Sequence, residues 1–447
     1  LGRLYADKIA ILVDDREPVS PEIRSNLESL GVKFAAWSSR QASDFDIVHI
    51  ADPMYVHPEF ASPFHRFGTT RLSATFYDLI PMRMYEGQVA NWPGYLARLD
   101  QLRESGASLL CISDFTRRDL LSSTKIDATR THVVMAGFNA SNTGKIWSRA
   151  DGDALLKRLG IDRPFFLHVG ATDPHKNFQG ALTASHLVSR QRPTQLVVVG
   201  KLSNSLASVR DQVVQSGLMN VVFTDFLQRE ELELLYSRAV ATLFMSRYEG
   251  FGFPALEAMA NGCPVVCSAA TSLPEVVGDA AILHDPDDAQ GAALSMLRLM
   301  DDTSWRESLA AKGRARAATF RWEDVATRTW AIWDDLSTQT APTPESAPPP
   351  AKVRWVSPVW DPSGYGDESR AFVRHLAGTD LGVSLVAWGR HSESFRRASS
   401  PDDRKRLDGL MGREIPPGSP VVLDMPGSAL GRFPGAGHHV GRTTFET

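Results

Sequence analysis

The stretch "SRYEGFGFPALEAMANGCPVVCS", residues Ser246 to Ser268, joins a Gly-Phe-Gly turn to the start of a predicted helix. Glu249 and Glu257 lie on either side of the turn, eight positions apart. The apolar run from Ala241 to Ser246 predicts a strand before it. A proline just after the turn suits a first helical turn, and Gly262 with the following proline predicts the helix end. The unit therefore reads as strand, glycine turn and helix.

The same alternation continues on both sides of this unit. The apolar, β-branched runs that predict strands are Phe165 to Gly170, Gln195 to Gly200, Val221 to Phe226, Ala241 to Ser246, Pro264 to Ser268 and Ala281 to Asp285. Helical patterns lie between them, for example from Arg229. Near-continuous apolar strands separated by helices are typical of a parallel sheet covered on both faces.

The preceding residues predict a second sheet of the same kind. Strands are expected at Lys8 to Asp15, Asp46 to Ala51, Arg71 to Pro81 and Ser108 to Ser113, and helices at Pro21 to Leu30, Gly94 to Glu104 and Asp114 to Ser122. A polar, glycine-containing loop at 139–151 joins the two halves. We therefore predict an α/β protein with two facing Rossmann-like domains, residues 1–145 and 146–336, and a ligand cleft between them.

A third segment follows these two domains. Residues 337–352 are rich in Pro, Ser and Thr, which predicts an extended linker. Residues 353–447 resume the pattern of strand, glycine turn and helix, beginning with "VRWVSPVWDPSGYGDESRAF". This length suits part of another α/β domain.

Composition restricts the classes of partner. The 447 residues contain 48 basic and 52 acidic side chains, a balance that does not favour a nucleic-acid partner. No apolar run is long enough to predict a transmembrane helix, and no signal-peptide pattern is seen. Cys111, Cys263 and Cys267 are too few for a disulfide framework and suit a reducing compartment.

The glycine turn predicts a phosphate site. Gly250 and Gly252 fall in a strand-to-helix loop at the carboxyl edge of the sheet, where backbone N–H groups and the helix end can hold a pyrophosphate. We expect Glu257 in the first turn of the helix, where its carboxylate could accept hydrogen bonds from a ribose diol. Glu249 could hold a sugar hydroxyl. A nucleotide sugar would contact all three groups, with its pyrophosphate at the glycine turn, its ribose at Glu257 and its sugar at Glu249.

Other interpretations of the same residues stay open. Glu257 could have no role beyond complementing the helix dipole, and Glu249 could be a solvated loop residue. The spacing of Gly250, Gly252 and Ala255 also fits a dinucleotide fingerprint, although that fingerprint belongs in the first βαβ unit of a dehydrogenase. A glycosidase could use the two glutamates as acid and nucleophile. A non-catalytic sugar-binding module is a third class.

The chain resembles the retaining GT-B glycosyltransferases of family 4. Their hallmark is a pair of glutamates with seven residues between them, matched here by Glu249 and Glu257 and continued by "NGCPVVCSAATSLPEVVGDAA" to Ala281. The resemblance implies that Gly250, Phe251 and Gly252 bind the donor.

An upstream string, "LHVGATDPHKNFQGALTA", also resembles this family. The resemblance places Gly170 in the turn and Lys176 on the donor's diphosphate. Two basic positions common in relatives are Ala171 and His175 here, with His175 retained as a donor-binding candidate. Arg247 is expected to supply some of the missing positive charge.

Two strings in the first half resemble the family's cleft-facing segments. In "ATFYDLIP", Tyr77 occupies a position often held by His, followed by Asp78, and both are candidates for the catalytic site. In "CISDFTRRDLL", the resemblance places Ser113 and Arg117 facing the cleft. A solvated position for Arg117 on its helix is an equal alternative.

The ends of the sequence suggest a longer protein. The first strand and glycine loop of such domains are not found before Lys8, so we expect them to be missing from this chain. The loop Ser363 to Gly366 resembles that missing start, which predicts a second glycosyltransferase module in the full-length chain. Alternatively, the tail's first strand completes the first domain's sheet.

The resemblance implies a hexosyltransferase that moves a hexose, with mannose from GDP-mannose as the expected donor. The implied acceptor is a glycan or lipid-linked glycan in polysaccharide or lipopolysaccharide assembly. It implies no metal and no cofactor besides the donor, and a cytoplasmic location with a peripheral contact at the membrane's inner face. The alternative is a catalytically impaired nucleotide-sugar or glycan-binding module of a larger enzyme.

Overall fold

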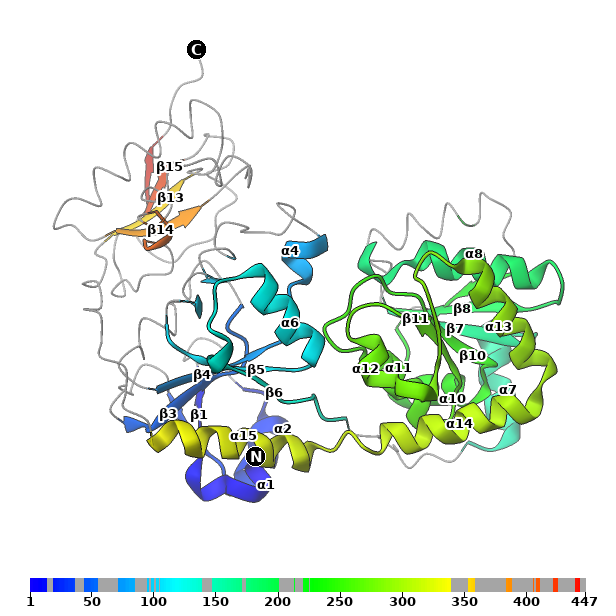
Figure 1. Ribbon diagram of the computed structural model, residues 1–447, viewed down its shortest axis with the longest axis horizontal. Helices are drawn as coiled ribbons and strands as arrows, with labels where there is room; N and C mark the ends of the chain where they lie inside the picture. Colours follow the sequence, from blue (N-terminus) through cyan, green and yellow to red (C-terminus); the bar gives the residue numbers. More distant parts are fainter. Residues whose placement is uncertain are drawn as a thin grey trace, which may run out of the picture.

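Each of the two predicted domains contains a parallel sheet, and Figure 1 shows them side by side in the computed structural model. The structure describes residues 1–13, 19–36, 44–54, 71–84, 105–138, 147–170, 174–200, 220–224, 226–338, 353–357, 383–387, 421–424 and 439–442, with isolated positions between them. Within these residues, no helix combines the length and apolar character that a membrane span requires.

The second domain has a six-stranded sheet in the order β12-β11-β10-β7-β8-β9. Its strands are β7 (Phe165–Val169), β8 (Gln195–Val199), β9 (Val221–Phe223), β10 (Ala241–Phe244), β11 (Val265–Ser268) and β12 (Ile282–His284). All neighbouring pairs are parallel, which confirms the sequence-based prediction. The order reverses between β7 and β10, and ligands of such sheets bind in the crevice at that reversal.

Helices cover both faces of this sheet. They are α7 (Arg149–Arg158), α8 (Phe178–Ser189), α10 (Arg229–Arg238), α11 (Phe253–Ala260), α12 (Leu273–Val277), α13 (Ala289–Asp301) and α14 (Thr303–Ala317). Leu256 and Met259 of α11 belong to the core on one face, and Ala184 of α8 and Met296 of α13 belong to the core on the other. This is why β8, β10 and β11 are buried along their whole length.

The strands of the first domain are divided between two sheets, unlike those of the second domain. Its parallel sheet has the order β3-β4-β5-β6, with strands β3 (Ile47–Ile50), β4 (Arg71–Phe76), β5 (Ser108–Cys111) and β6 (Thr131–Val133). β1 (Ala10–Val13) and β2 (Lys33–Ala36) form a separate parallel pair. Among its described residues, the helices are α1 (Gly2–Tyr5), α2 (Pro21–Ser29), α4 (Ile80–Met84) and α6 (Asp114–Ser123). Most of the predicted helix Gly94 to Glu104 lies outside the described residues. Strands β2 and β6 were not predicted, since both are short and mixed in polarity.

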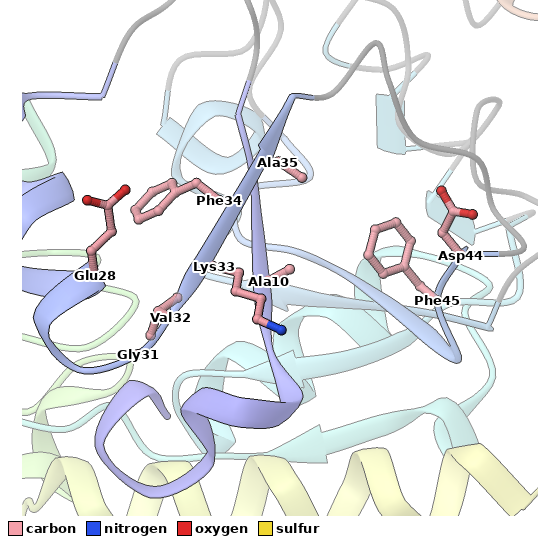
Figure 2. Close-up of a pocket in the computed structure, with 9 residues that line it drawn as sticks. All are labelled: Ala10, Glu28, Gly31, Val32, Lys33, Phe34, Ala35, Asp44 and Phe45. Atoms are coloured by element: carbon pink, nitrogen blue, oxygen red, sulfur yellow. The ribbon is translucent and has the colours of Figure 1, made fainter.

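A cavity of about 560 Å³ lies beside the β1–β2 pair. Figure 2 shows Phe34 with Glu28 on one side of it and Phe45 with Asp44 on the other. None of the lining residues belongs to the site predicted from the sequence.

The last helix of the two-domain unit, α15 (Trp322–Thr338), packs on the first domain although it follows the second in the chain. The indole of Trp330 stacks on Tyr5 with ring centroids 4.2 Å apart. Trp333 Nε1 donates to Ser73 Oγ in β4 at 2.8 Å. Figure 1 shows this helix running along the edge of the first domain. The predicted division assigned it to residues 146–336, whereas its contacts tie it to the first sheet.

The tail has a sheet of its own. β13 (Val353–Ser357), β14 (Val383–Ala387), β15 (Val421–Asp424) and β16 (His439–Arg442) are parallel, in the order β14-β13-β15-β16. β13 lies between β14 and β15, so the alternative in which it completes the first domain's sheet is wrong. The loop Ser363 to Gly366 and most of the predicted linker lie outside the described residues.

Candidate functional site

The loop after β7 carries Gly170 and Lys176 to the point where the strand order reverses. Gly170 has φ +125°, a conformation that favours glycine, and a Cβ there would lie 3.9 Å from Lys176 Cε. Lys176 ends a short 3₁₀ turn, after which Asn177 caps α8 by accepting from Gly180 N at 3.2 Å. Ala171 lies outside the described residues. The loop therefore delivers the lysine directly above the sheet edge.

The loop after β10 brings Glu249 to the same point. Lys176 Nζ and Glu249 Oε1 are 2.8 Å apart, with side-chain exposures of 18% and 8%. The ammonium also lies 5.5 Å from the centre of the Phe244 ring. Two candidates that are far apart in sequence thus form a largely buried ion pair. Each currently neutralises the other, so an incoming anion would compete with Glu249 for Lys176.

The glycine turn is tightly packed on both sides. Gly252 has φ +116° at the start of α11, and a Cβ there would lie 2.6 Å from Leu273 Cδ2. A Cβ on Gly250 would lie 2.5 Å from the carbonyl oxygen of Tyr77 in the other domain. Phe251 is only 2% exposed, and its ring packs against Phe253 and Phe320. The predicted donor contact of Phe251 can therefore involve only its backbone, because its side chain belongs to the core.

Two hydroxyl residues that no sequence pattern indicated hold this turn. Thr271 Oγ1 accepts from Glu249 N at 3.0 Å. Ser272 Oγ donates towards the carbonyl oxygens of Glu249 and Phe251, at 2.9 and 2.8 Å. Both residues lie in the quoted string "AATSLPEVV", but nothing in their spacing indicated that they contact the turn.

Glu257 lies beyond the first turn of α11, which contains no acidic residue, so the expected first-turn position is wrong. The helix starts at Phe253, and this places the glutamate one turn further on. Tyr236 Oη donates to Glu257 Oε2 at 3.0 Å. Burial raises the pKa of the Glu257 carboxyl, while the Tyr236 hydrogen bond and the charge of Arg229 oppose that rise. Tyr236 was missed because its contact is made between two helices.

His175 and Arg247 are not part of the Lys176–Glu249 pair. The His175 side chain is buried, and its carbonyl oxygen accepts from Arg247 N at 2.7 Å, which ties the two loops together. The Arg247 guanidinium forms an ion pair with Asp287 at the surface. Its charge is therefore already balanced by a carboxylate.

The first domain brings the backbone carbonyl of Tyr77 and the side chain of Asp78 against the glycine turn. Tyr77 is 45% exposed, and burial raises the pKa of its hydroxyl. Asp78 Oδ1 accepts from Ile80 N at 2.9 Å. Burial and the charge of Glu249 raise the pKa of Asp78, while the Ile80 hydrogen bond and Lys176 lower it. A Cβ on Gly250, the residue after Glu249, would lie 2.8 Å from Asp78 Cβ, so Asp78 packs against the turn and the two domains share one polar site.

Helix α6 meets the turn through its first residues. Ser113 Oγ and Thr116 Oγ1 lie 2.7 and 3.1 Å from the carbonyl oxygen of Gly250. Ser113 thus faces the other domain as predicted. Arg117 does not, because its Nε donates to the backbone and hydroxyl oxygens of Thr131, at 3.1 and 2.9 Å. The expectation that Arg117 faces the cleft is wrong, since its position on α6 turns it towards β6.

A second contact between the domains was also missed. Tyr248 Oη donates to Asp119 of α6, and the same carboxylate receives a hydrogen bond from Arg83. The rings of Tyr248 and Phe115 meet edge to face, with centroids 5.3 Å apart. Burial and the Asp119 hydrogen bond raise the pKa of the Tyr248 hydroxyl. Tyr248, the residue before Glu249, is therefore anchored on the first domain through its side chain.

Among the described residues, no group of three or more His, Cys, Asp or Glu side chains is arranged to hold a metal ion. In the part of the chain that the structure describes, the charged groups at the centre of the site are Lys176 and the carboxylates of Glu249 and Asp78. This set can bind hydroxyl groups through the carboxylates and an anion through the lysine.

Two facing domains with parallel sheets, whose polar loops meet at the reversal of strand order, are the architecture of the GT-B fold. The chain belongs to the family described as "Glycosyl transferases group 1", whose model matches residues 153–316. That match spans β7 to β12 and includes both glutamates and Lys176.

Among its relatives is the O-antigen chain mannosyltransferase B of Escherichia coli, 31% identical over 66% of this chain and 75% of that protein. The MMP alpha-(1->4)-mannosyltransferase of Mycolicibacterium hassiacum is 29% identical over 57% of this chain and 60% of its own length. The serotype-specific mannosyltransferase WbdA of Escherichia coli is 25% identical over 69% of this chain, which spans only 39% of that protein.

Solved structures share the fold. The Anabaena protein HepE, in complex with UDP and glucose, aligns with a TM-score of 0.54 at 18% identity, covering 74% of this chain and all of HepE. Sucrose-phosphate synthase from Thermosynechococcus elongatus aligns with a TM-score of 0.54 at 21% identity, covering 74% of this chain and 89% of the synthase. At these identities the likeness concerns the fold.

Proposed function

We propose that this protein transfers mannose from GDP-mannose to a glycan or lipid-linked acceptor in polysaccharide or lipopolysaccharide assembly, with retention of the anomeric configuration. The observation that carries the proposal is the Lys176–Glu249 pair at the reversal of strand order, beside a glycine turn that meets Asp78 of the facing domain. The names of the mannosyltransferase relatives favour mannose as the transferred sugar.

The residues take separate roles in this proposal. Lys176 leaves Glu249 to contact the diphosphate and, with the amides of the Gly250–Gly252 turn, stabilises the negative charge that develops as the diphosphate departs. The freed Glu249 carboxylate accepts a hydrogen bond from a sugar hydroxyl. Glu257, held by Tyr236, binds the ribose diol. Tyr77 and Asp78 face the transferring sugar from the other domain.

In the proposed transfer step, the sugar passes directly from the diphosphate to the acceptor, with no covalent enzyme intermediate and no metal ion. The acceptor hydroxyl attacks the anomeric carbon on the face from which the nucleoside diphosphate departs. The bond from that carbon to the phosphate oxygen breaks as the bond to the acceptor oxygen forms. The acceptor's proton passes to the departing phosphate, whose charge Lys176 compensates.

The proposal also covers the location of the protein in the cell and a further module in its chain. Cys111, Cys263 and Cys267 are free and buried, which is compatible with a reducing cytoplasm. We place the enzyme there, with a peripheral contact at the inner face of the membrane, where a lipid-linked acceptor would be reached. The tail sheet supports a second glycosyltransferase module in the full-length chain.

The second candidate function is an impaired nucleotide-sugar or glycan-binding module. It is favoured by the ion pairs that already occupy Lys176 and Arg247. Such a module would bind donor without transferring sugar, so radiolabelled mannose transfer by the full-length protein separates the two functions.

Calorimetric titration with GDP-mannose, UDP-glucose and the two free nucleoside diphosphates tests the proposal. We expect GDP-mannose to bind most tightly, and Lys176→Ala and Glu257→Ala each to weaken binding by about 1–3 kcal/mol, the cost of a lost charged hydrogen bond. Lys157→Ala and Glu307→Ala, at exposed positions of α7 and α14, are the matched controls. Unchanged affinity in both site variants would remove the site assignment.

A further inference from the structure

A carboxylate of the second domain caps a helix of the first. Glu275, in α12, accepts hydrogen bonds from Asp114 N at 3.1 Å and Phe115 N at 2.9 Å. These amides open α6, and the first N–H groups of a helix have no partner within it. A carboxylate at this end also interacts favourably with the helix dipole. Glu275 therefore makes two charge-assisted hydrogen bonds across the domain boundary.

The backbone of Glu275 is itself fixed. Arg316 of α14 donates from Nη2 to the carbonyl oxygen of Glu275 at 2.6 Å and from Nε to that of Val276 at 2.8 Å. These bonds satisfy carbonyl groups of the short helix α12 and tie it to a longer one. The backbone of Glu275 is thus held by α14. Its contact with α6 therefore couples the position of the second domain to that of the first.

The same short segment also holds the glycine turn. Ser272, three residues before Glu275, bonds the carbonyl oxygens of Glu249 and Phe251. From the other side, Ser113 and Thr116 of α6 bond the carbonyl oxygen of Gly250. The start of α6 is therefore joined to the turn by two routes, one direct and one through Glu275 and α12.

We propose that Glu275 is a positioning residue that sets the closed spacing of the two domains. This inference rests on the proposed function, since it assigns Glu275 a role in the same transfer. With Glu275 docked on α6, Tyr77 and Asp78 face the turn that carries Glu249. Without it, water solvates the α6 amides and more open arrangements become populated. The nucleotide contacts assigned to the second domain are retained, whereas groups from the first domain are misplaced for transfer.

The kinetic test separates positioning from folding. Glu275→Ala should lower kcat for mannose transfer from GDP-mannose by about ten- to a hundredfold, while the Kd for GDP stays within about twofold. Glu275→Gln keeps one acceptor without the charge and should recover part of kcat. Asp279→Ala is the matched control, because Asp279 lies four residues away and pairs with Lys312 of its own domain. An unchanged kcat in Glu275→Ala, or equal losses of kcat and GDP affinity, overturns the proposal.

A distance measurement tests the same inference without activity. Spin labels on Lys125→Cys and Glu307→Cys, at exposed positions of the first and second domains, report the domain spacing by pulsed electron resonance. With GDP-mannose present, we expect a broader distribution extending to longer distances in Glu275→Ala than in the parent or in Asp279→Ala. Identical distributions overturn the proposal. If the parent neither binds GDP-mannose nor transfers mannose, the proposed function fails, and this measurement still decides whether Glu275 sets the spacing.

Discussion

The two domains share one architecture but are completed in different ways. The second domain covers its six-stranded sheet with helices from the same stretch of the chain, from α7 just before β7 to α14 after β12. The first domain receives α15 from the far side of the second, and the Trp333–Ser73 hydrogen bond joins positions 260 residues apart. One domain is therefore encoded locally, whereas the other depends on a long-range contact. This difference predicts where substitutions act.

Trp333→Ala should have the largest effect and should affect the first domain alone. It removes a half-buried indole that packs beside His49 and donates to Ser73. We expect a loss of about 2–3 kcal/mol in the free energy of opening of the first sheet. Native-state hydrogen exchange at β4 and β10 measures both domains in one experiment.

Trp305→Ala provides the mirror-image control, because Trp305 packs against the core of the second domain and lies 4.1 Å from the Arg298 guanidinium. It should accelerate exchange at β10 and spare β4. Equal acceleration of β4 and β10 by Trp333→Ala would contradict the separation of the domains.

Gly250→Ala tests the boundary between the domains. The new Cβ would lie 2.5 Å from Tyr77 O and 2.8 Å from Asp78 Cβ, so the domains must separate slightly or the turn must shift. A cost of about 1–3 kcal/mol should lower the proposed mannose transfer by about ten- to a hundredfold. Steady-state transfer assays measure this loss. In the control Gly152→Ala, the nearest atom is a guanidinium nitrogen of Arg238 at 3.1 Å, which can move, and activity should persist.

Tyr236→Phe tests the second domain by itself and its pH dependence. The Tyr236 hydroxyl stabilises the ionised form of Glu257, so its removal raises the pKa of Glu257 further. If the carboxylate binds the ribose, nucleotide affinity falls as the pH is lowered through that pKa. The fall should begin at a higher pH in Tyr236→Phe than in the parent, with a loss of about 1 kcal/mol where the two profiles differ. GDP titrations from pH 5 to 8 give both profiles, and superimposable profiles would argue against a ribose contact.

Arg247→Ala should have the smallest effect. Arg247 and Asp287 have side-chain exposures of 40% and 70%, so water screens their ion pair. We expect a change of at most about 0.5–1 kcal/mol in the stability of the second domain. Chemical denaturation measures it, with Arg163→Ala as a control at another exposed ion pair. A large loss of GDP affinity in Arg247→Ala would instead assign its charge to the phosphates.

The sequence alone was sufficient to predict the alternation of strands and helices from which the second domain is built. Each predicted strand of the second domain overlaps an observed one, because strands buried on both faces carry continuous apolar runs. The glutamate pair, the glycine turn and Lys176 could be selected from strings that lie within single loops and helices. The family resemblance covers these same strings, and the match to residues 153–316 confirms it.

Only the tertiary structure decided how these pieces meet. The Lys176–Glu249 pair, the contact of Gly250 with Tyr77, and the docking of Glu275 on α6 join segments 73 to more than 160 positions apart. The burial of Phe251 also depends on Phe320 of a distant segment. Local periodicity encodes which face of an element is apolar, but the partner of that face is chosen by packing across the whole chain.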